Sequence, residues 1–339
     1  MDDGIVFDYV VETDECIFKD EIENSGGEIY HIADKSALPL KNIRDNYELL
    51  KRLRDTHEVA YFNLESLTWI EPIRMALKFG YRVCVHAHMS DFVVDDAVHH
   101  AIHSLNKRRL SHINVTRMTC SDKARNFMFF PGNSVIMVHN AIDIDRFRFD
   151  RSIRSRVRTD LKIKDDEKVI GFVGRLRKQK NPLFLVDILH AITEECDCDV
   201  KMIILGEGEL GERLRERIEE YSLSDKTIIL GNKPNVNEYY QAMDVLVMPS
   251  FHEGLPFTAV EAQAAGLHCV VSDRITRETN ITGNVSFLQI NDACLWGKRI
   301  SEILSTEYDR SQNSALMEQT PFNIKTEVWK LEQLLCRVL

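Results

Sequence analysis

The sequence predicts an α/β protein with parallel sheets, divided into two units of ordinary domain size. Short apolar runs rich in β-branched residues alternate with longer amphipathic patterns, which is typical of strands joined by helices that cover both faces of a sheet. Ten such runs are many for a single open sheet. The 339 residues are also enough to bury two separate hydrophobic cores.

The strands are expected in short segments spread over both halves of the chain. They are residues 5–11, 59–63, 82–87, 112–116, 134–138, 168–173, 200–205, 227–230, 245–249 and 269–272. Helical patterns fill most of the intervals, for example 182–193, 210–221, 236–242 and 257–265. The tail from Asn323 to Leu339 repeats apolar residues at helical spacing and predicts a terminal helix.

A basic segment at residues 140–159 marks the junction between the two units, because a new strand begins only near Lys168. We therefore expect a first unit over residues 1–150 and a second unit over residues 151–318. The C-terminal helix is expected over residues 319–339.

Composition excludes several classes of protein. The formal net charge of -10 argues against a nucleic-acid partner, since bulk attraction to phosphate is absent. No apolar run approaches the roughly 18 residues of a membrane span, and the acidic start, Met1-Asp2-Asp3, does not resemble a signal peptide. The eight cysteines show no CxxC pattern, which favours reduced thiols in a cytoplasmic protein.

The segment 245–266 has the strongest functional pattern. An apolar strand is followed by a loop with Glu253 and Gly254, and a helix begins near Pro256 and ends at Gly266. Ligands of open α/β sheets bind at the carboxyl ends of strands, where a helix N-terminus presents free N–H groups to an anion. Gly254 allows a phosphate or sugar to approach the backbone closely.

Glu261 falls in the second turn of this helix, where its carboxylate could accept two hydrogen bonds from a diol such as ribose. Taken alone, Glu253 and Glu261 could also be solvated charges beside an ordinary strand–helix unit. The glycine and proline between them favour a binding loop.

A second basic loop follows the strand at 168–173. It begins at Gly174, and four of the next six residues are basic, including Arg175 and Lys180. Arginine and lysine at the carboxyl end of a strand suit a diphosphate, because guanidinium binds oxygens in pairs and ammonium acts as a point charge. A basic surface loop without a ligand is the alternative.

Together these motifs resemble the retaining glycosyltransferases of family 4, which have the GT-B fold of two facing Rossmann-like domains. The resemblance covers most of the chain and is strongest to enzymes that build bacterial capsules, exopolysaccharides and related surface glycans. The matching segments are Gly174-Arg-Leu…Lys180, Glu253-Gly-Leu-Pro-Phe-x-x-x-Glu261, Cys120-Ser-Asp-Lys-Ala, Asn140-Ala-Ile-Asp143…Phe147 and Val271-Ser-Asp273…Glu278.

The resemblance implies a site for a nucleotide-sugar donor, taken to be a UDP-sugar, with no metal and no other cofactor. Arg175 and Lys180 would hold the diphosphate beside Gly174, and Glu261 would bind the ribose hydroxyls. The base would contact the loop at Lys233 and Pro234.

The resemblance also assigns the donor sugar. Glu253 would bind sugar hydroxyls, with the backbone of Gly254 and Leu255 close to the sugar and phosphate. His88 matches the histidine of the family's first domain that faces the sugar across the cleft, although His86 lies beside it in the sequence. The C-terminal helix would cross back to the first domain.

The implied mechanism is a displacement on one face of the sugar, in which the leaving phosphate oxygen helps to deprotonate the acceptor hydroxyl. Retaining glycosidases use a carboxylate nucleophile, but here Glu253 is expected to position the donor and stabilise charge. The acceptor would be a glycan or a lipid-linked glycan.

Two other patterns have alternative interpretations. Residues 206–211 fit G-x-G-x-x-G, but Glu207 and Glu209 would repel a pyrophosphate and no ribose-binding acid follows, so a tight turn is favoured over an NAD site. Asp143-Ile-Asp145 is a D-x-D pattern that can bind metal, although Asp143 suits a helix cap better.

A histidine-containing stretch and a basic stretch also have alternative interpretations. His99 and His103 have metal-ligand spacing, but a partly exposed helix face is the better interpretation. Residues 146–158 hold six arginines and one acid, so they could contact anionic lipid at the inner face of the plasma membrane. A solvated linker helix is the favoured interpretation.

The sequence departs from the family at its start. Residues 5–11 resemble the family's second strand, and Gly26-Gly27 precede the third, so the opening strand–helix unit is expected to be missing. Ala141 replaces the usual glycine of the junction. One rival function is a nucleotide-sugar 2-epimerase on the same fold. The other is a non-catalytic nucleotide-sugar-binding subunit, which the missing unit would favour.

Overall fold

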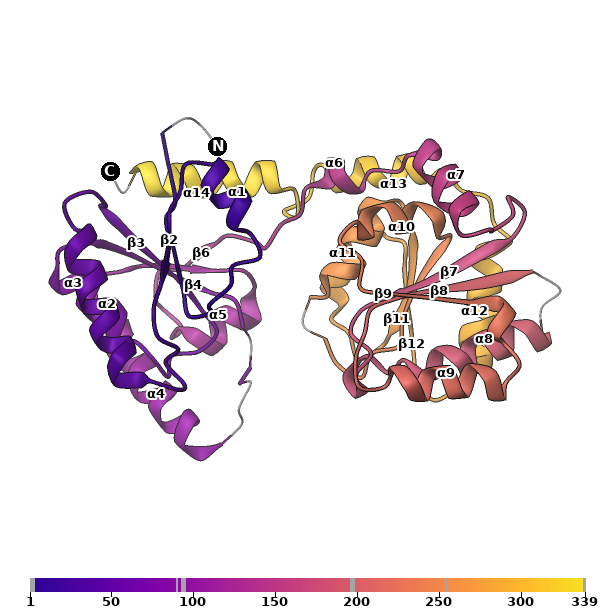
Figure 1. Cartoon of the computed structure of the whole chain (residues 1–339), viewed down its shortest axis with the longest axis horizontal. Helices are drawn as coiled ribbons and strands as arrows, with labels where there is room; N and C mark the ends of the chain where they lie inside the picture. The colour runs from indigo at the N-terminus through magenta and orange to yellow at the C-terminus, as the bar shows by residue number, and fades with distance from the viewer. Residues whose placement is uncertain (1–3, 90, 93–95, 196–198, 254, 338–339) are drawn as a thin grey trace. The chain divides into compact units, whose positions relative to one another are not determined.

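The computed structural model describes residues 4–89, 91–92, 96–195, 199–253 and 255–337 (Figure 1). The chain forms two compact units, one of Met1–Asn140 with Lys325–Leu339 and one of Ala141–Ile324. The chain therefore passes between the units twice, and its C-terminal helix returns to the first unit as expected. All strand pairs in the described residues are parallel, which confirms the α/β class.

The first unit has a four-stranded sheet in the order β3-β4-β5-β6 and a separate pair, β1-β2. Its strands are β1 (Tyr9–Val11), β2 (Ile29–His31), β3 (Val59–Leu64), β4 (Arg82–Ala87), β5 (Thr116–Thr119) and β6 (Ile136–Met137). Its helices are α1 (Lys19–Asn24), α2 (Pro39–Leu53), α3 (Glu71–Lys78), α4 (Ala97–Ser111), α5 (Asp122–Met128) and α14 (Ile324–Arg337).

The second unit has a six-stranded sheet in the order β12-β11-β10-β7-β8-β9. Its strands are β7 (Lys168–Val173), β8 (Val200–Leu205), β9 (Thr227–Gly231), β10 (Val245–Met248), β11 (His268–Ser272) and β12 (Val285–Leu288). Its α-helices are α6 (Ile144–Phe147), α7 (Arg151–Asp160), α8 (Leu183–Glu195), α9 (Gly211–Glu220), α10 (Val236–Ala242), α11 (Phe257–Ala264), α12 (Ala293–Leu304) and α13 (Arg310–Met317). Short 3₁₀ turns are η1 (Lys178–Lys180), η2 (Ser224–Lys226) and η3 (Arg277–Thr279).

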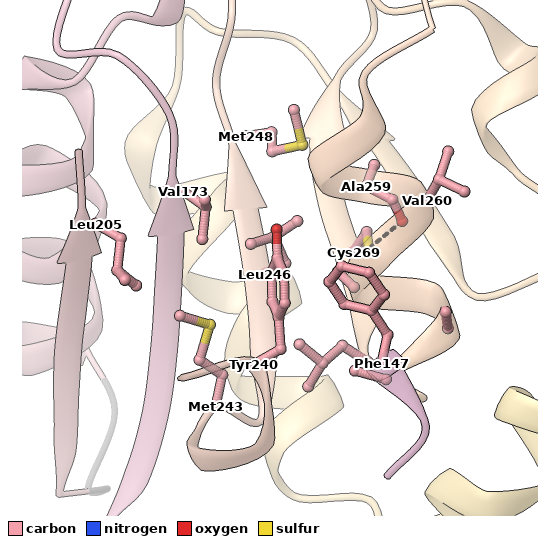
Figure 2. Close-up of a cluster of buried hydrophobic side chains, with 14 of the residues drawn as sticks. Phe147, Val173, Leu205, Tyr240, Met243, Leu246, Met248, Ala259, Val260 and Cys269 are labelled. Atoms are coloured by element: carbon pink, nitrogen blue, oxygen red, sulfur yellow. Dashed lines mark hydrogen bonds between the residues drawn. The ribbon is translucent and has the colours of Figure 1, made fainter. Parts of the chain in front are cut away.

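Helices bury both faces of the six-stranded sheet. Alternate residues of each strand point to opposite faces and so enter different cores. Ile170 and Phe172 of β7 belong to the core shared with α8, α9 and α12. Val173 of the same strand belongs to the core shared with α7, α10, α11 and α13. Figure 2 shows part of this second core, where Tyr240 lies along β10 with its hydroxyl toward the Met248 end of the strand. The strands are therefore mostly apolar, although Lys168 begins β7 and Lys201 is the second residue of β8. This composition is typical of a doubly covered parallel sheet.

The four-stranded sheet is also covered on both faces. Helices α3, α4 and α5 contribute Ile73, Leu110 and Met128 to one core. On the other face, Leu335 of α14 packs with residues of β4 and β5. Glu327 of α14 is buried and accepts a hydrogen bond from the backbone N–H of His139 at 2.7 Å, which ties the helix to the end of the first unit.

Two strands were not predicted, and one was predicted in the wrong place. Strand β5 occupies Thr116–Thr119 rather than residues 112–116, because α4 runs to Ser111 and its C-cap is His112. Strands β2 and β12 are short and carry half-exposed residues, so they lack the apolar runs by which the others were recognised.

The glycine-rich segment 206–211 joins β8 to α9 and packs against the backbone of the loop after β7. The N–H of Leu176 donates to the carbonyl of Glu207 at 2.9 Å. A Cβ atom on Gly206 would lie 2.0 Å from the carbonyl oxygen of Gly174, and Gly206 has a φ of +131°. The motif is therefore explained by close backbone packing, in agreement with the tight turn predicted in place of an NAD site.

We predict that Gly206→Ala lowers the free energy of unfolding of the second unit by about 2–4 kcal/mol, because the added methyl group meets backbone atoms that cannot move aside. Gly211→Ala is the matched control. Its new methyl group would only contact side chains at 3.6 Å or more, so its thermal midpoint should equal or slightly exceed that of the wild type. Thermal unfolding of both variants measures the difference, and equal midpoints would contradict the packing role of Gly206.

Candidate functional site

Strands β7 and β10 are neighbours in the sheet, but the helices that follow them cover opposite faces. Helix α8, after β7, packs on one face through Leu185 and Leu189. Helix α11, after β10, packs on the other face through Ala259 and Val260. The loops that leave the two strands must therefore separate, and such a switch point is where open α/β sheets bind ligands. Both sequence motifs of the second unit lie in these two loops.

The two loops are held together by three contacts. The N–H of Phe251 donates to the carbonyl of Gln179 at 2.8 Å, and the side-chain amide of Gln179 donates to the carbonyl of His252 at 3.0 Å. The third contact is an ion pair between Lys180 Nζ and Glu253 Oε1 at 2.6 Å.

This ion pair is largely buried, and its geometry falls outside that of a hydrogen bond. The side chains of Lys180 and Glu253 are 18% and 10% exposed. Glu253 Oε1 accepts no hydrogen bond within the described residues. A carboxylate oxygen that is buried and incompletely satisfied retains the capacity to accept a hydrogen bond from a hydroxyl group. The backbone of Glu253 also pairs with Ile275 in the loop after β11.

Glu261 lies in α11, one turn further from the loop, and its carboxylate is held by Tyr240 of α10. The hydroxyl of Tyr240 donates to Glu261 Oε2 at 2.9 Å and also lies 3.3 Å from the carbonyl of Thr258. Burial raises the pKa of Glu261, and the hydrogen bond from Tyr240 and the charge of Arg146 oppose that rise. Burial also raises the pKa of Tyr240 well above its ordinary value, so this hydroxyl remains a donor.

The remaining residues predicted for the donor site lie around the same edge of the sheet. Gly174 follows β7 directly and is half-buried, whereas the next residue, Arg175, is exposed. Leu255 packs against the hydrophobic core on the α11 side. Lys233 and Pro234 follow β9, half-buried and exposed respectively. Gly254 lies outside the described residues.

His88 belongs to the first unit, where it follows β4. Its ring nitrogens lie 2.8 Å from Asn63 Oδ1 and 3.0 Å from Asn140 Oδ1. Its ring also packs against that of His86, with centroids 4.1 Å apart. Burial lowers the pKa of His88 and lowers that of His86 to about 4. His86 contacts the hydroxyl of Tyr61 and the carbonyl of Val138, so its ring is occupied inside the unit.

Sequence reasoning missed three side chains that hold predicted site residues. They are Tyr240, which contacts Glu261, and Asn63 and Asn140, which contact His88. The role of Tyr240 could not be recognised, because its position in the sequence fits an apolar residue on the buried face of an amphipathic helix. Asn63 and Asn140 each lie at or after the carboxyl end of a strand, and this position was the available signal.

The arginines of the segment 146–158 are used in part inside the second unit. Arg154 donates to three carbonyls at the C-terminal end of α10 at 2.9–3.1 Å and pairs with Asp244 at 2.7 Å. Arg158 is 2% exposed and donates to the carbonyl of Ala242. These two side chains are neither available to a lipid surface nor solvated, so both the lipid contact considered for the whole segment and the favoured solvated helix need correction. The carbonyls at a helix end attract cations, which explains their burial.

The D-x-D pattern has a structural role. Asp143 is the N-cap of α6 and accepts a hydrogen bond from the N–H of Asp145 at 3.2 Å, as its position predicted. Asp145 pairs with Arg148 at 2.9 Å. In the described part of the chain, no group of three or more His, Cys, Asp or Glu side chains is arranged to hold a metal ion.

The chain is similar to known glycosyltransferases. Residues 154–315 match the family described as glycosyl transferases group 1. The putative glycosyltransferase EpsF of Bacillus subtilis strain 168 is 26% identical over 347 residues, covering 95% of this chain and 90% of that protein. A second relative, the UDP-Gal:alpha-D-GlcNAc-diphosphoundecaprenol alpha-1,3-galactosyltransferase of Escherichia coli, is 32% identical over 152 residues. That match covers 44% of this chain and only 38% of the relative.

Two solved structures resemble the chain over nearly its whole length. Anabaena Alr3699/HepE in complex with UDP has a TM-score of 0.77 at 16% identity, covering 97% of this chain and 91% of that one. A glycosyltransferase from Rickettsia africae has a TM-score of 0.76 at 14% identity, covering 96% and 88%. In the described residues, no helix combines the length and the hydropathy that a membrane span requires. The chain thus has the GT-B fold, its relatives indicate a glycosyltransferase, and the segment that matches the group 1 family lies within the second unit.

Proposed function

We propose that the protein is a retaining, metal-independent glycosyltransferase that moves a sugar from a UDP-sugar to a glycan or lipid-linked acceptor in the synthesis of a surface polysaccharide. The observation that carries the proposal is the Lys180–Glu253 ion pair at the switch point, where a cation for phosphate adjoins an acceptor for sugar hydroxyls. The name of the Escherichia coli relative combines a UDP-sugar with a lipid diphosphate acceptor, which supports both substrate classes.

The donor would bind along the ends of β7 and β10. Arg175 is exposed and free to approach a diphosphate, while Lys180 has three N–H donors and can serve Glu253 and a phosphate oxygen together. Glu261 would accept hydrogen bonds from the ribose, and Lys233 and Pro234 would border the base. Glu253 would accept hydrogen bonds from the donor sugar.

In the proposed reaction, the bond between the anomeric carbon and the phosphate oxygen breaks on the same face on which the acceptor oxygen bonds. The acceptor proton passes to the departing diphosphate, whose negative charge Arg175 and Lys180 would stabilise. Glu253 is assigned a positioning and electrostatic role, because an ammonium group 2.6 Å away reduces the nucleophilicity of its carboxylate. His88 would contact the sugar from the first unit, and the protein would work at the cytoplasmic face of the membrane that carries the acceptor.

The donor class can be tested by thermal unfolding with a panel of UDP-, GDP- and ADP-sugars, since a ligand of the folded state raises the midpoint. We expect the largest rise with a UDP-sugar. Product analysis with and without acceptor then separates transfer from the alternatives. An epimerised sugar formed without acceptor, or donor binding with no turnover under any condition, would contradict a transferase.

We predict that Glu253→Gln lowers kcat about a hundredfold or more, because the glutamine lacks the charge that stabilises the reacting donor. UDP binding should survive, since Lys180 no longer shares its charge with a carboxylate. Calorimetry with UDP and initial rates with the donor measure the two effects. Glu212→Gln, an exposed change on α9, serves as the control that leaves both quantities unchanged. Lost UDP binding with intact turnover would refute the assignment of Glu253.

We predict that Tyr240 positions Glu261 toward the ribose. Tyr240→Phe keeps the buried ring but removes the hydrogen bond to Glu261. The variant should therefore discriminate less between UDP and 2′-deoxy-UDP, with the ratio of their Kd values reduced about three- to tenfold. Tyr239→Phe, a half-buried neighbour, is the matched control and should retain the wild-type ratio.

The same measurement in a Glu261→Ala background separates two possible failures. If Tyr240 acts through Glu261, adding Tyr240→Phe to Glu261→Ala should cause no further change in the ratio. A wild-type ratio in Glu261→Ala itself would remove Glu261 from the ribose site. A normal ratio in Tyr240→Phe alone would leave Glu261 in place but deny Tyr240 its positioning role.

A further inference from the structure

Glu207, in the turn after β8, connects the loops that follow the two neighbouring strands, β7 and β9. Its carbonyl accepts a hydrogen bond from the N–H of Leu176 at 2.9 Å, in the loop after β7. Its carboxylate accepts one from the side-chain amide of Asn232 at 3.1 Å, in the loop after β9. Glu207 therefore links the loop proposed for the diphosphate to the loop proposed for the base.

The backbone beside Asn232 leaves room for this carboxylate. Gly231 has a φ of +68°, and a Cβ atom there would lie 2.9 Å from Glu207 Oε1. A side chain at this position would therefore meet the carboxylate, and glycine avoids that contact. The carbonyl of Gly231 also accepts a hydrogen bond from the N–H of Gly206 at 2.9 Å. The two loops are thus joined through the backbone as well as through the side chains.

The contact with Glu207 determines which way the amide of Asn232 faces. A carboxylate only accepts hydrogen bonds, so the NH₂ group of Asn232 must point toward Glu207 and its oxygen Oδ1 must point away. Asn232 is exposed, so Oδ1 and the second N–H of the amide are accessible to a ligand. The side chain therefore presents one acceptor and one donor in a fixed order.

Helix α10 relates this side chain to the residue proposed for the ribose. The loop with Asn232 leads into α10, and Tyr240, one turn into that helix, donates to Glu261 at 2.9 Å. Helices α10 and α11 also share one core on the same face of the sheet. With its ribose on Glu261, a nucleoside would extend its base toward the loop that carries Asn232.

We propose that Asn232 recognises the base of the donor nucleotide and that Glu207 makes it select uracil over cytosine. With its NH₂ group toward Glu207, Asn232 accepts a hydrogen bond from uracil N3–H at Oδ1 and donates its second N–H to uracil O4. Cytosine has an acceptor at N3 and an amino group at C4, so it requires the amide to turn over. The turned amide would place Oδ1 against the Glu207 carboxylate, and two acceptors form no hydrogen bond.

This inference deepens the proposed function, because it rests on a UDP-sugar donor and identifies how its base is recognised. Asn232 would contact the base directly and determine specificity. Glu207 would act only through Asn232 and is a positioning residue. The assignment also gives a use to the acidic residue of the glycine-rich turn, whose carboxylate is directed to the base loop.

The test is calorimetry of UDP and CDP binding to the full chain and its variants. We expect the wild type to bind UDP about twentyfold or more tighter than CDP. In Glu207→Gln, the new amide can donate to or accept from Asn232, so both orientations of Asn232 become available. The UDP preference should then fall about fivefold or more, through tighter CDP binding, with UDP binding changed by about twofold at most. A general loosening of the site cannot tighten CDP binding.

Two further variants complete the experiment. Asn232→Ala should bind UDP and CDP with nearly equal affinity, and adding Glu207→Gln to it should cause no further change in the ratio. Glu209→Gln is the matched control, because it neutralises an exposed acid of the same turn, and it should keep the wild-type ratio. All three substituted side chains are exposed, so the thermal midpoints should stay close to that of the wild type.

The outcomes separate this inference from the proposed function. A wild-type ratio in Glu207→Gln or in Asn232→Ala would overturn the inference, and intact UDP binding would leave the proposed function in place. The inference is also wrong if Glu209→Gln lowers the ratio equally, or if Glu207→Gln lowers it only by weakening UDP binding. A wild type that binds neither nucleotide, or that prefers CDP, would overturn both the inference and the proposed UDP-sugar donor.

Discussion

The proposed site of the second unit depends on one feature of its sheet. The helices that follow the neighbouring strands β7 and β10 cover opposite faces. Ligands of open α/β sheets bind beside the carboxyl ends of such strands. The sequence places Lys180 in the loop after β7 and Glu253 in the loop after β10, and their ion pair joins the two loops. Removing one partner of a buried pair leaves an uncompensated charge, so a single substitution of Lys180 or Glu253 is expected to destabilise the loops that contain the proposed site.

A buried arginine, Arg310, links the C-terminal ends of α10 and α11. Arg310 donates to the carbonyls of Tyr240 and Met243 at the end of α10 and to the carbonyl of Ala265 at the end of α11. Burial lowers the pKa of Arg310 to about 9, which shows the electrostatic cost of this position. The guanidinium group holds together the two helices that carry Tyr240 and Glu261. The arrangement of that pair therefore depends on packing at the C-terminal ends of both helices.

These arginines also show where the sequence is informative and where it is not. The strands β4, β7 and β8 could be predicted to the residue, since a doubly covered parallel strand is apolar over most of its length. The Glu253 and Lys180 loops could be located because they follow such strands. The direction of a charged side chain depends on partners far along the chain. Arg154, for example, binds carbonyls about 90 positions away, so its burial could not be predicted from its basic neighbourhood.

The burial of His103 in helix α4 could not be predicted from its local sequence either. Its histidine spacing suggested an exposed face, because nothing in the local sequence indicates that Leu67 and Phe127 supply the groups that His103 binds. Once a polar residue is fixed inside by backbone groups, the apolar residues of the same helix have only the outer face left. The exposure of Val98, Ile102 and Leu105 is thus a consequence of hydrogen bonds between residues far apart in the sequence.

The environment of His88 limits how it can serve a donor sugar. A neutral imidazole has one donor and one acceptor nitrogen, so it can donate to only one of the two amide oxygens beside it. The other amide must then turn its NH₂ group toward the ring, or the ring must be protonated. Burial lowers the pKa of His88, which favours the neutral ring with one amide turned. Both ring nitrogens are then occupied by Asn63 and Asn140. In the proposed reaction, His88 must therefore exchange one of these asparagines for a sugar hydroxyl, so the asparagines become part of the site's chemistry rather than its scaffold.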